Sequence, residues 1–351
     1  MRRMALLMVA FLLLGAVRGQ QGEGSGDAFR VLFWNVENFF DTLHDEGFSD
    51  EEFLPQGERR WTSHRYWQKA TEVAKVIVAS PSPALPVGAR DGKSEGMKNE
   101  KFEKDGRYRG EERVPDLVGL CEVENDSVMV LLTRRSVLRE LHYDYVMTHS
   151  EDARGIDVAL LYQPARFRLL ESRSLRVASR EHGLRPTRDI LYAKGLVRSG
   201  AGVDTLHVMV VHLPSRAGGS EGDRNRELAA ARLWGAVDSV LHTSAAPKVV
   251  VMGDFNAALG DRVFRGAPLR TTDDARAQGT YCFRGYWQWL DHVLVSESVV
   301  TRQAARPVEL PWLLEENKTY GGKMPRRTFR GPTYHGGISD HLPVALDMWF
   351  E

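Results

Sequence analysis

The polar residues of this chain that could perform chemistry stand at the ends of apolar runs typical of β-strands. One such run occupies residues 249–252 and is followed almost at once by Asp254. Carboxylate and carbonyl oxygens gathered at one edge of a sheet are the ligands that a hard divalent cation such as Mg²⁺ or Mn²⁺ prefers. We therefore predict one metal-dependent site. Its polar residues are Asn35, Glu122, Asp254, Asn256, Asp340 and His341.

The elements that must position these residues alternate between strand and helix patterns. Amphipathic helices are expected at 64–79, 126–141 and 225–241, with Asn125 in the N-cap position of the second. This periodicity indicates a mixed α/β protein, but it does not distinguish two packed sheets from one doubly wound sheet. The expected strands are 29–36, 116–121, 143–147, 157–162, 167–177, 190–197, 205–212, 248–252, 281–283, 291–295 and 342–349.

Seven short stretches of the chain form an ordered set: Phe33–Asn38, Gly119–Asn125, Arg154–Tyr162, Val211–Arg216, Gly253–Asn256, Leu290–Val295 and Ser339–Pro343. In this order they resemble the motifs of the endonuclease/exonuclease/phosphatase superfamily. The resemblance covers residues 29–350 and implies a four-layer α/β/β/α fold, in which two β-sheets pack face to face between flanking helices. It also implies metal-dependent hydrolysis of phosphoesters by a single domain at 29–351.

Each candidate residue is suited by its type to one part of phosphodiester hydrolysis. Hydrolysis requires charge neutralisation, an activated water and stabilisation of the leaving oxygen. We expect Glu122 to ligate the cation and Asn35 to bind or position it, and by resemblance Asp340 helps to hold the metal. Asp254 is the candidate for orienting and deprotonating the attacking water. Asn256 is expected to donate to the phosphate oxygens or to orient that water.

Two histidines are expected beside the scissile phosphate. His341 as an imidazolium would stabilise developing negative charge, and Asp291 resembles the family carboxylate that orients this histidine. His212 resembles a second active-site histidine of the deoxyribonuclease-like and deadenylase-like branches. Asp157 is expected either to orient His212 or to form a structural pair with Arg154.

Three arginines are candidates for gripping the substrate phosphate through charge-assisted hydrogen bonds: Arg154, Arg216 and Arg226. For Arg226, at the start of a predicted helix, a solvated side chain is the alternative. A further basic segment with one aromatic residue, 326–330, leads toward Asp340. It is the best candidate for a nucleic-acid groove, and ordinary surface charge is the alternative.

The N-terminus has the features of a secretory signal peptide at residues 1–19. Arg2 and Arg3 precede an apolar run from Met4 to Val17, which is too short to span a bilayer. We expect cleavage after Gly19, a flexible N-terminus at 20–28, and a secreted or periplasmic protein. An N-terminal anchor or a buried helix is the alternative. Residues 80–113 combine prolines with mixed charges and are predicted to form a flexible insertion.

Composition narrows the function classes. The chain has 47 basic and 47 acidic residues, and without the signal peptide 44 basic residues face 47 acidic ones. The chain therefore has no overall excess of positive charge for binding nucleic acid, although this balance does not exclude a local basic groove. Only Cys121 and Cys282 are present, so the chain is not a disulfide-stapled scaffold. No later segment is long and apolar enough to cross a membrane.

Three functions remain open on the sequence. The first is a secreted, endonuclease-like phosphodiesterase acting on DNA or RNA, and the second is a phosphoesterase acting on a lipid headgroup or a small phosphate ester. The third is a non-catalytic binding module on the same fold, which the retained acidic and amide residues argue against. The aromatic stretch 286–289 fits either a membrane-contacting hairpin or a core strand. The sequence favours the endonuclease-like enzyme, and it decides neither the substrate nor the oligomeric state.

Overall fold

The computed structural model describes residues 28–80, 113–177, 183–184, 186–200, 202–216 and 218–350. The signal peptide predicted at 1–19 and nearly all of the N-terminus predicted at 20–28 lie outside the described residues. Of the insertion predicted at 80–113, only Ser80 and Arg113 are described.

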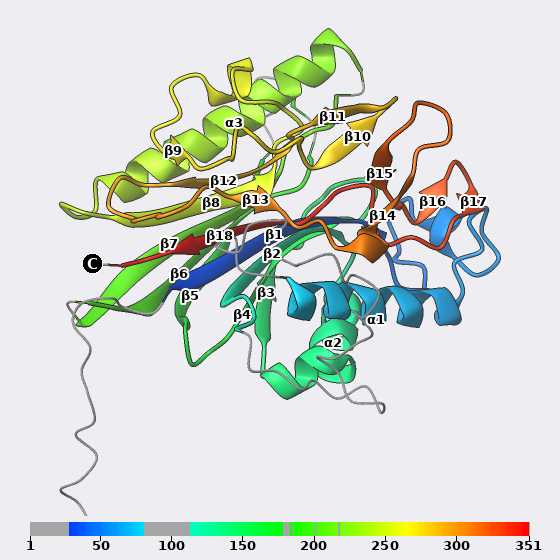
Figure 1. Cartoon of the computed structure of the whole chain (residues 1–351), viewed down its shortest axis with the longest axis horizontal. Helices are drawn as coiled ribbons and strands as arrows, with labels where there is room; N and C mark the ends of the chain where they lie inside the picture. The colour runs from blue at the N-terminus through cyan, green and yellow to red at the C-terminus, as the bar shows by residue number, and fades with distance from the viewer. Residues whose placement is uncertain are drawn as a thin grey trace, which may run out of the picture.

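Two six-stranded sheets form the centre of the fold (Figure 1). Their strand orders are β13-β18-β1-β2-β4-β3 and β5-β6-β7-β8-β12-β9. The first sheet contains β1 (Phe29–Phe39), β2 (Leu117–Val123), β3 (Asp144–Met147), β4 (Asp157–Tyr162), β13 (Arg306–Pro307) and β18 (Val344–Met348). The second contains β5 (Arg168–Leu175), β6 (Ile190–Ser199), β7 (Gly202–His212), β8 (Lys248–Asp254), β9 (Arg270–Thr271) and β12 (Asp291–Val295).

Helices cover the outer face of each sheet. In Figure 1, α1 (Ser63–Ala79) and α2 (Asp126–Arg135) lie against the first sheet, and α3 (Ser220–Leu241) lies against the second. The structure therefore confirms the expected four-layer order of helices, sheet, sheet and helix.

No helix among the described residues is both long and apolar enough to cross a membrane.

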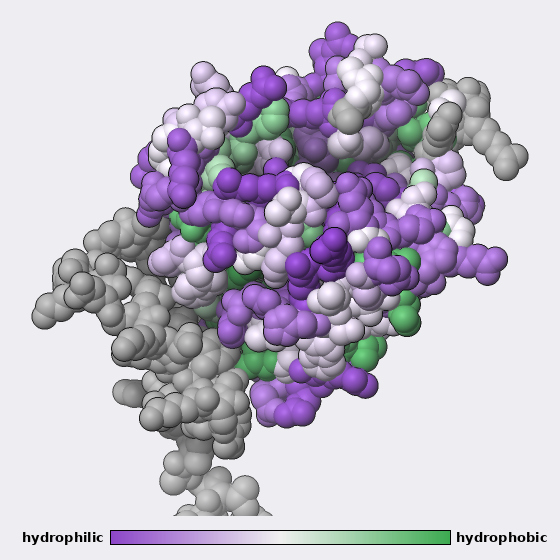
Figure 2. Space-filling view, turned by 90° about the vertical axis from the view of Figure 1, so that its right-hand side faces the viewer, coloured by the Kyte–Doolittle hydropathy of each residue, from purple (hydrophilic) through white to green (hydrophobic). Residues whose placement is uncertain are grey.

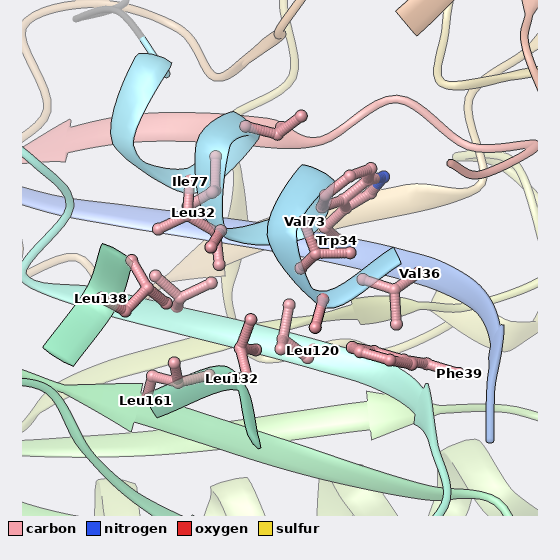
Figure 3. Packing of buried hydrophobic residues seen from close by; sticks show 14 of the residues in the cluster. Leu32, Trp34, Val36, Phe39, Val73, Ile77, Leu120, Leu132, Leu138 and Leu161 are labelled. Atoms are coloured by element: carbon pink, nitrogen blue, oxygen red, sulfur yellow. The ribbon is translucent and has the colours of Figure 1, made fainter. Parts of the chain in front are cut away.

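Three apolar clusters hold these layers together. Phe33, Met252 and Val344 belong to the cluster between the two sheets, whose inner faces are buried. Leu32 belongs to a second cluster that packs α1 and α2 onto the first sheet (Figure 3), and Leu233 to a third that packs α3 onto the second sheet. Central strands covered on both faces need apolar residues on both sides. This is why β1, β2 and β8 are nearly continuous apolar runs.

Local signals account for both ends of α2. The Asn125 side chain accepts a hydrogen bond from the Val128 amide at 3.2 Å, which confirms the predicted N-cap of α2. The helix ends at Arg135, earlier than predicted, because Ser136 is extended and begins a separate 3₁₀ helix, Val137–Leu141.

Several strands of two or three residues were missed by the sequence patterns, although the strand at 281–283 was expected. The region between the expected strands 291–295 and 342–349 contributes β14 (Leu314–Glu316) and β15 (Lys323–Pro325), followed by β16 (Phe329–Arg330), which pairs with β17 (Thr333–Tyr334). The aromatic stretch at 286–289 belongs to a hairpin of β10 (Tyr281–Phe283) and β11 (Tyr286–Gln288). Strands of two or three residues are too short to show an alternating pattern of their own.

Candidate active site

The predicted site residues lie together at one end of the sheets, on the right-hand side of Figure 1. Strand pairing brings them there: β7 and β8 are parallel and place His212 opposite Asp254, while β12 places Asp291 opposite the same residue. From the other sheet, Asn35 on β1 donates to Asp254 across the sandwich at 3.0 Å. Figure 2 shows this end of the molecule, where hydrophilic side chains cover most of the surface.

His341 and Asp291 form a buried dyad. The Nδ1 atom of His341 is 2.7 Å from Oδ2 of Asp291, and Trp34 and Ser339 hold the backbone of His341 in place. Burial opposes a charge on this ring, but the carboxylates of Asp291 and Asp254 outweigh it and raise the pKa of His341 well above its ordinary value. The raised pKa favours the imidazolium form, which is the form that the sequence analysis assigned to charge stabilisation.

Asp254 lies at the centre of the cluster. Its Oδ2 atom accepts from the Asn35 amide and lies 3.8 Å from Nε2 of His341, and its Oδ1 accepts from the Asn256 backbone amide at 2.8 Å. Burial and the neighbouring Asp291 carboxylate raise the pKa of Asp254 to about 7. A carboxylate with a pKa near neutrality is suited to take a proton from water.

His212 approaches the same carboxylate but carries no charge. Its Nε2 atom lies 3.7 Å from Oδ2 of Asp254 and 3.9 Å from Oε1 of Glu122. Complete burial, together with the cations Arg188 and Arg154, lowers the pKa of His212 well below its ordinary value. The pKa values of the two histidines of the site are thus shifted in opposite directions.

Glu122 is turned into the site by an irregular backbone. The pairing of β2 with β4 shifts register between Cys121 and Val123, and Glu122 between them has a φ of 61°. Its carboxylate accepts from the Asn38 backbone amide at 2.8 Å and from the Asn35 side chain at 3.3 Å. This bulge gives Glu122 a direction that an alternating strand pattern does not predict.

Backbone strain is concentrated around the site. Among the described residues, seven other than glycine have a positive φ, and four of them are Glu37, Asn38, Glu122 and Asn256. Such conformations cost about 1–3 kcal/mol each and persist where the surrounding structure enforces them. Gly253 meets a different constraint, since a Cβ there would lie 2.4 Å from the Val211 carbonyl oxygen.

Asp340 is held by a partly buried network that the sequence analysis did not anticipate. Its carboxylate accepts from Arg327 at 2.5 Å, and Arg327 Nε lies 3.7 Å from Glu37. Glu37 in turn accepts from the Thr328 amide at 2.6 Å, and Lys69 donates to the Glu37 carbonyl oxygen. Glu37 lies within the stretch Phe33–Asn38, but its position predicted no function for it. Lys69 lies in a predicted helix and had no distinguishing signal.

The donor set fits a hard divalent cation. The side chains of Glu122 and Asp340 are 14% and 19% exposed, whereas those of Asp254 and Asp291 are 2% and 0% exposed. Glu122 and Asp340 are therefore the more exposed carboxylates of the site, and both offer oxygen to a cation. Asn35 turns its amide nitrogen toward the carboxylates because its oxygen accepts from the Glu37 amide at 2.9 Å. This arrangement favours its positioning role over direct ligation.

Two of the three predicted phosphate-binding arginines lie at the rim. Arg154 donates to the Asn38 side chain and lies 3.9 Å from Glu122, and Arg216 donates to the Asn256 carbonyl oxygen at 2.8 Å. Both side chains are at least 40% exposed and can reach an anion. The Asn256 side chain itself donates to Leu213 O at 3.1 Å, which fixes the turn after β8.

Arg226 and Asp157 are placed differently from the prediction. The Arg226 side chain is 7% exposed and binds Asp223 and the carbonyl oxygens of Pro214 and Ser215, so it braces the segment after β7 instead of facing the phosphate. The Asp157 carboxylate accepts from Thr148 at 2.5 Å and from the Ser150 amide.

No hydrogen bond joins Asp157 to His212, because the Asp157 carboxylate is already occupied by the segment after β3. The Nδ1 atom of His212 is buried and has no hydrogen-bond partner within the described ranges. The expected orienting contact is therefore absent from this part of the chain, and so is the alternative pair between Asp157 and Arg154, since Arg154 binds Asn38.

The basic segment 326–330 is largely neutralised. Arg327 reaches the site but is bound to Asp340, and Arg330 pairs with Glu315 at 2.8 Å. Among residues that the sequence analysis gave no role, Tyr281 packs its ring 4.9 Å from that of His341. Only its place in an expected strand could have drawn attention to it.

The fold and site together define a phosphoesterase or nuclease scaffold, and comparison with known proteins specifies the family. The chain matches the sequence model of the Endonuclease/Exonuclease/phosphatase family over residues 30–87 and 98–349. The protein belongs to this family, whose members are hydrolases of phosphoester bonds and are generally dependent on divalent metals. No curated protein matches the chain in sequence.

Solved structures share the fold at low sequence identity. A mannosyl-6-phosphatase of Bacteroides thetaiotaomicron has a TM-score of 0.54 at 14% identity, over 92% of this chain and 100% of that chain. The human Nocturnin catalytic domain with bound sulfate has a TM-score of 0.52 at 18% identity, over 92% and 95%. D. rerio TDP2 complexed with single-strand DNA product has a TM-score of 0.51 at 14% identity, over 92% and 99%.

Proposed function

We propose that this protein is a phosphodiester hydrolase that uses Mg²⁺ or Mn²⁺ and an activated water. The observation that carries the proposal is the position of Asp254, which has a pKa of about 7 and lies between the charged His341 and the Asn35 amide. A base, a cationic group and open oxygen ligands are the three components that hydrolysis of a phosphodiester requires.

Asp254 acts as the general base in this mechanism. Asn35 donates to its Oδ2 and the Asn256 amide donates to its Oδ1, so the carboxylate is fixed before substrate arrives. Asp254 takes a proton from the attacking water while Arg154 and Arg216 hold the phosphate at the rim. Fixed geometry of this kind supplies much of the rate enhancement of hydrolytic enzymes.

His341 stabilises charge on the phosphoryl group. Asp291 keeps one ring proton at Nδ1, which leaves the Nε2 proton free to donate to a phosphoryl oxygen. Glu122 and Asp340 would hold the divalent cation, which when bound would neutralise further charge on the phosphate and its leaving oxygen. His212, being neutral, adds no positive charge and would accept or donate a single hydrogen bond beside Glu122.

A nuclease is the more specific candidate, favoured by the exposed cations Arg154 and Arg216 at the rim. The basic segment that was expected to extend this rim gives weaker support, because Arg327 and Arg330 are each paired with an acid. A small phosphate ester or a lipid headgroup engages the site with one phosphate and needs no basic track. The second candidate is therefore a phosphoesterase for such substrates.

Purified protein should be assayed with Mg²⁺ or Mn²⁺ against plasmid DNA, RNA, sphingomyelin, bis(p-nitrophenyl) phosphate and monophosphate esters. Hydrolysis of the chromogenic diester that is abolished by His341→Ala supports the proposal, and activity on no phosphoester would refute it. Secretion after cleavage behind Gly19 stays part of the proposal, and N-terminal sequencing of the exported protein tests it.

A further inference from the structure

A thiol, an imidazole and a carboxylate meet at the inner edge of the site, in a set that the proposed mechanism does not use as a unit. Cys121 lies where the regular pairing of β2 ends, and His212 and Asp254 are the last residues of β7 and β8. One ligand atom from each residue, a sulfur, a ring nitrogen and a carboxylate oxygen, lies within 4.8 Å of the other two. Three strands therefore bring three different donor atoms to one small volume.

The imidazole of His212 is free to bind an ion. Its Nδ1 atom is buried and has no hydrogen-bond partner in the described part of the chain. Its Nε2 atom lies 3.7 Å from Asp254 and 3.9 Å from Glu122, beyond hydrogen-bond distance. A buried polar atom without a partner is costly, and a bond to a metal ion would remove that cost.

The thiol of Cys121 is the second free ligand. Cys121 forms no disulfide and is fully buried in the apolar cluster between the two sheets. A buried cysteine is ordinarily an inert residue of the core. The sulfur of Cys121 differs because an imidazole and a carboxylate lie beside it, so the three side chains together can hold an ion.

The donor atoms select the kind of ion. Zn²⁺ binds sulfur at about 2.3 Å and nitrogen or oxygen at about 2.0–2.2 Å, often with three protein ligands and one open position. Atoms within 4.8 Å of one another need only small side-chain movements to reach one ion at such bond lengths. Mg²⁺ and Mn²⁺ prefer oxygen, which Glu122 and Asp340 offer on the more exposed side of the site.

A second group of potential ligands, Asp254 with Asp291 and His341, suits a soft cation less well. Its imidazole is already engaged, because Nδ1 of His341 lies 2.7 Å from Asp291. This group also contains no sulfur. The set with Cys121 therefore combines the two features that Zn²⁺ prefers over Mg²⁺, a free imidazole and a thiol.

Glu122 connects the set to solvent. Its side chain is 14% exposed, and its Oε1 atom lies 3.9 Å from Nε2 of His212. A cation attracted by this carboxylate is therefore already next to the imidazole, although Cys121 and Asp254 are themselves buried.

We propose that Cys121, His212 and Asp254 bind a soft divalent cation such as Zn²⁺, and that this cation inhibits the enzyme. On binding, the thiol proton of Cys121 passes to solvent and the thiolate ligates the ion. The ion also occupies the carboxylate of Asp254, which then no longer accepts a proton from the attacking water. Binding rests on the three ligands alone, whereas inhibition rests on the proposed function.

Cobalt spectroscopy tests the site without turnover. The chain has two cysteines, so in the Cys282→Ser protein a sulfur-to-cobalt charge-transfer band in the near ultraviolet reports on Cys121 alone. We expect Co²⁺ to produce this band, an equal amount of Zn²⁺ to remove most of it, and an equal amount of Mg²⁺ to leave it unchanged. Absence of the band, or its loss on addition of Mg²⁺, overturns the proposal.

Calorimetry with Zn²⁺ measures the contribution of the thiol. Cys121→Ser keeps the size of the side chain but removes the sulfur, so the affinity should fall at least about tenfold, the loss that even a supporting group of a metal site causes. Cys282→Ser is the matched control, since Cys282 lies on the hairpin of β10 and β11. Equal affinity in a folded Cys121→Ser protein overturns the site. If Cys121→Ser does not fold, the cobalt spectrum of the Cys282→Ser protein decides.

Inhibition is measured on bis(p-nitrophenyl) phosphate at saturating Mg²⁺. Zn²⁺ should inhibit the wild type and Cys282→Ser alike. Cys121→Ser should keep its basal rate, because Cys121 has no part in the chemical step, and should need at least about tenfold more Zn²⁺ for half-inhibition. Zn²⁺ that binds through Cys121 without slowing hydrolysis overturns the inhibitory role.

The failures of the two proposals are distinguishable. A wild-type protein that hydrolyses no phosphoester refutes the proposed function, while the charge-transfer band and the Zn²⁺ affinities still test the site. An active enzyme that shows neither the band nor a Zn²⁺ affinity dependent on Cys121 overturns the site and leaves the proposed function standing.

Discussion

His212 and His341 each bring Nε2 to within 3.8 Å of the same oxygen, Oδ2 of Asp254, yet their pKa values are shifted in opposite directions. The difference arises from their partners. Asp291 hydrogen-bonds to Nδ1 of His341, whereas the Nδ1 of His212 has no partner in the described structure and arginines lie nearby. The two imidazoles beside the Asp254 carboxylate therefore differ in the direction of their pKa shifts, and this difference gives the two histidines different roles.

Replacing the central carboxylate should stop the chemistry without unfolding the protein. Asp254→Asn keeps the shape of the side chain but removes the base, so kcat should fall by about a hundredfold or more. The thermal midpoint should stay near that of the wild type, because burial already raises the pKa of Asp254 to about 7 and an uncharged group is tolerated there. A variant with near-wild-type kcat would remove Asp254 from the mechanism.

Asp291→Asn should act through His341. Without the carboxylate, the pKa of His341 falls, so the alkaline limb of the kcat profile should move to lower pH and kcat should drop at least about tenfold. Asp204→Asn is a suitable control, since Asp204 pairs with Lys248 at the far end of the same sheet. An unshifted alkaline limb in Asp291→Asn would show that the dyad does not set the charge of His341.

The concentration of divalent cation needed for activity should depend on Glu122 and Asp340. Chelation should abolish activity, and Glu122→Gln should raise the concentration of Mg²⁺ or Mn²⁺ needed for half-maximal activity by about tenfold or more. Glu124→Gln is the matched control on the same segment, because burial and the nearby Asp41 raise the pKa of Glu124 to about 9 and the amide resembles its protonated form. Full turnover after dialysis into excess chelator would contradict the prediction.

Two arginines of the same segment should behave differently. Arg327→Gln removes the partner of Asp340 and should lower kcat on any phosphodiester, whereas Arg330→Gln breaks a surface pair with Glu315, which is worth little. Rates on a chromogenic diester and on DNA at two salt concentrations make the comparison. If Arg330→Gln selectively weakens and flattens the salt dependence of DNA cleavage, the segment contacts nucleic acid after all.

His292 should stabilise the fold in a pH-dependent manner. Its ring contacts two acceptors, Asp273 at 2.6 Å and the Ala257 carbonyl oxygen at 2.8 Å, and it can donate to both only as an imidazolium. Burial lowers the pKa of His292, but Asp273 outweighs it and the net shift is upward. The stabilisation is thus complete below the ordinary pKa and is lost as pH rises through the raised value.

The thermal midpoints of wild type and His292→Gln should therefore differ more at about pH 6 than at about pH 9. A difference that grows toward high pH would show that His292 is neutral in the folded protein.

The sequence by itself determined the positions of the reacting groups and the layers that carry them. Asp254, Asp291 and His341 adjoin long apolar runs, and a buried strand must be apolar whatever its partners are, so these motifs were recognisable locally. Periodicity left open whether one doubly wound sheet or two packed sheets would form, and the two-sheet fold was implied only by the resemblance of the ordered motifs to a known family. Roles that depend only on the type of a residue and on its place at the end of a strand could therefore be predicted from the sequence.

Tertiary structure alone decided the contacts that set charge and direction. The bulge at Glu122, the pairing of Arg330 with Glu315 and the bracing position of Arg226 all arise where separate segments of the chain meet. The same holds for the set of Cys121, His212 and Asp254, which come from three separate strands. Burial and long-range partners shift pKa values and occupy hydrogen-bonding groups, and neither is encoded in a local pattern.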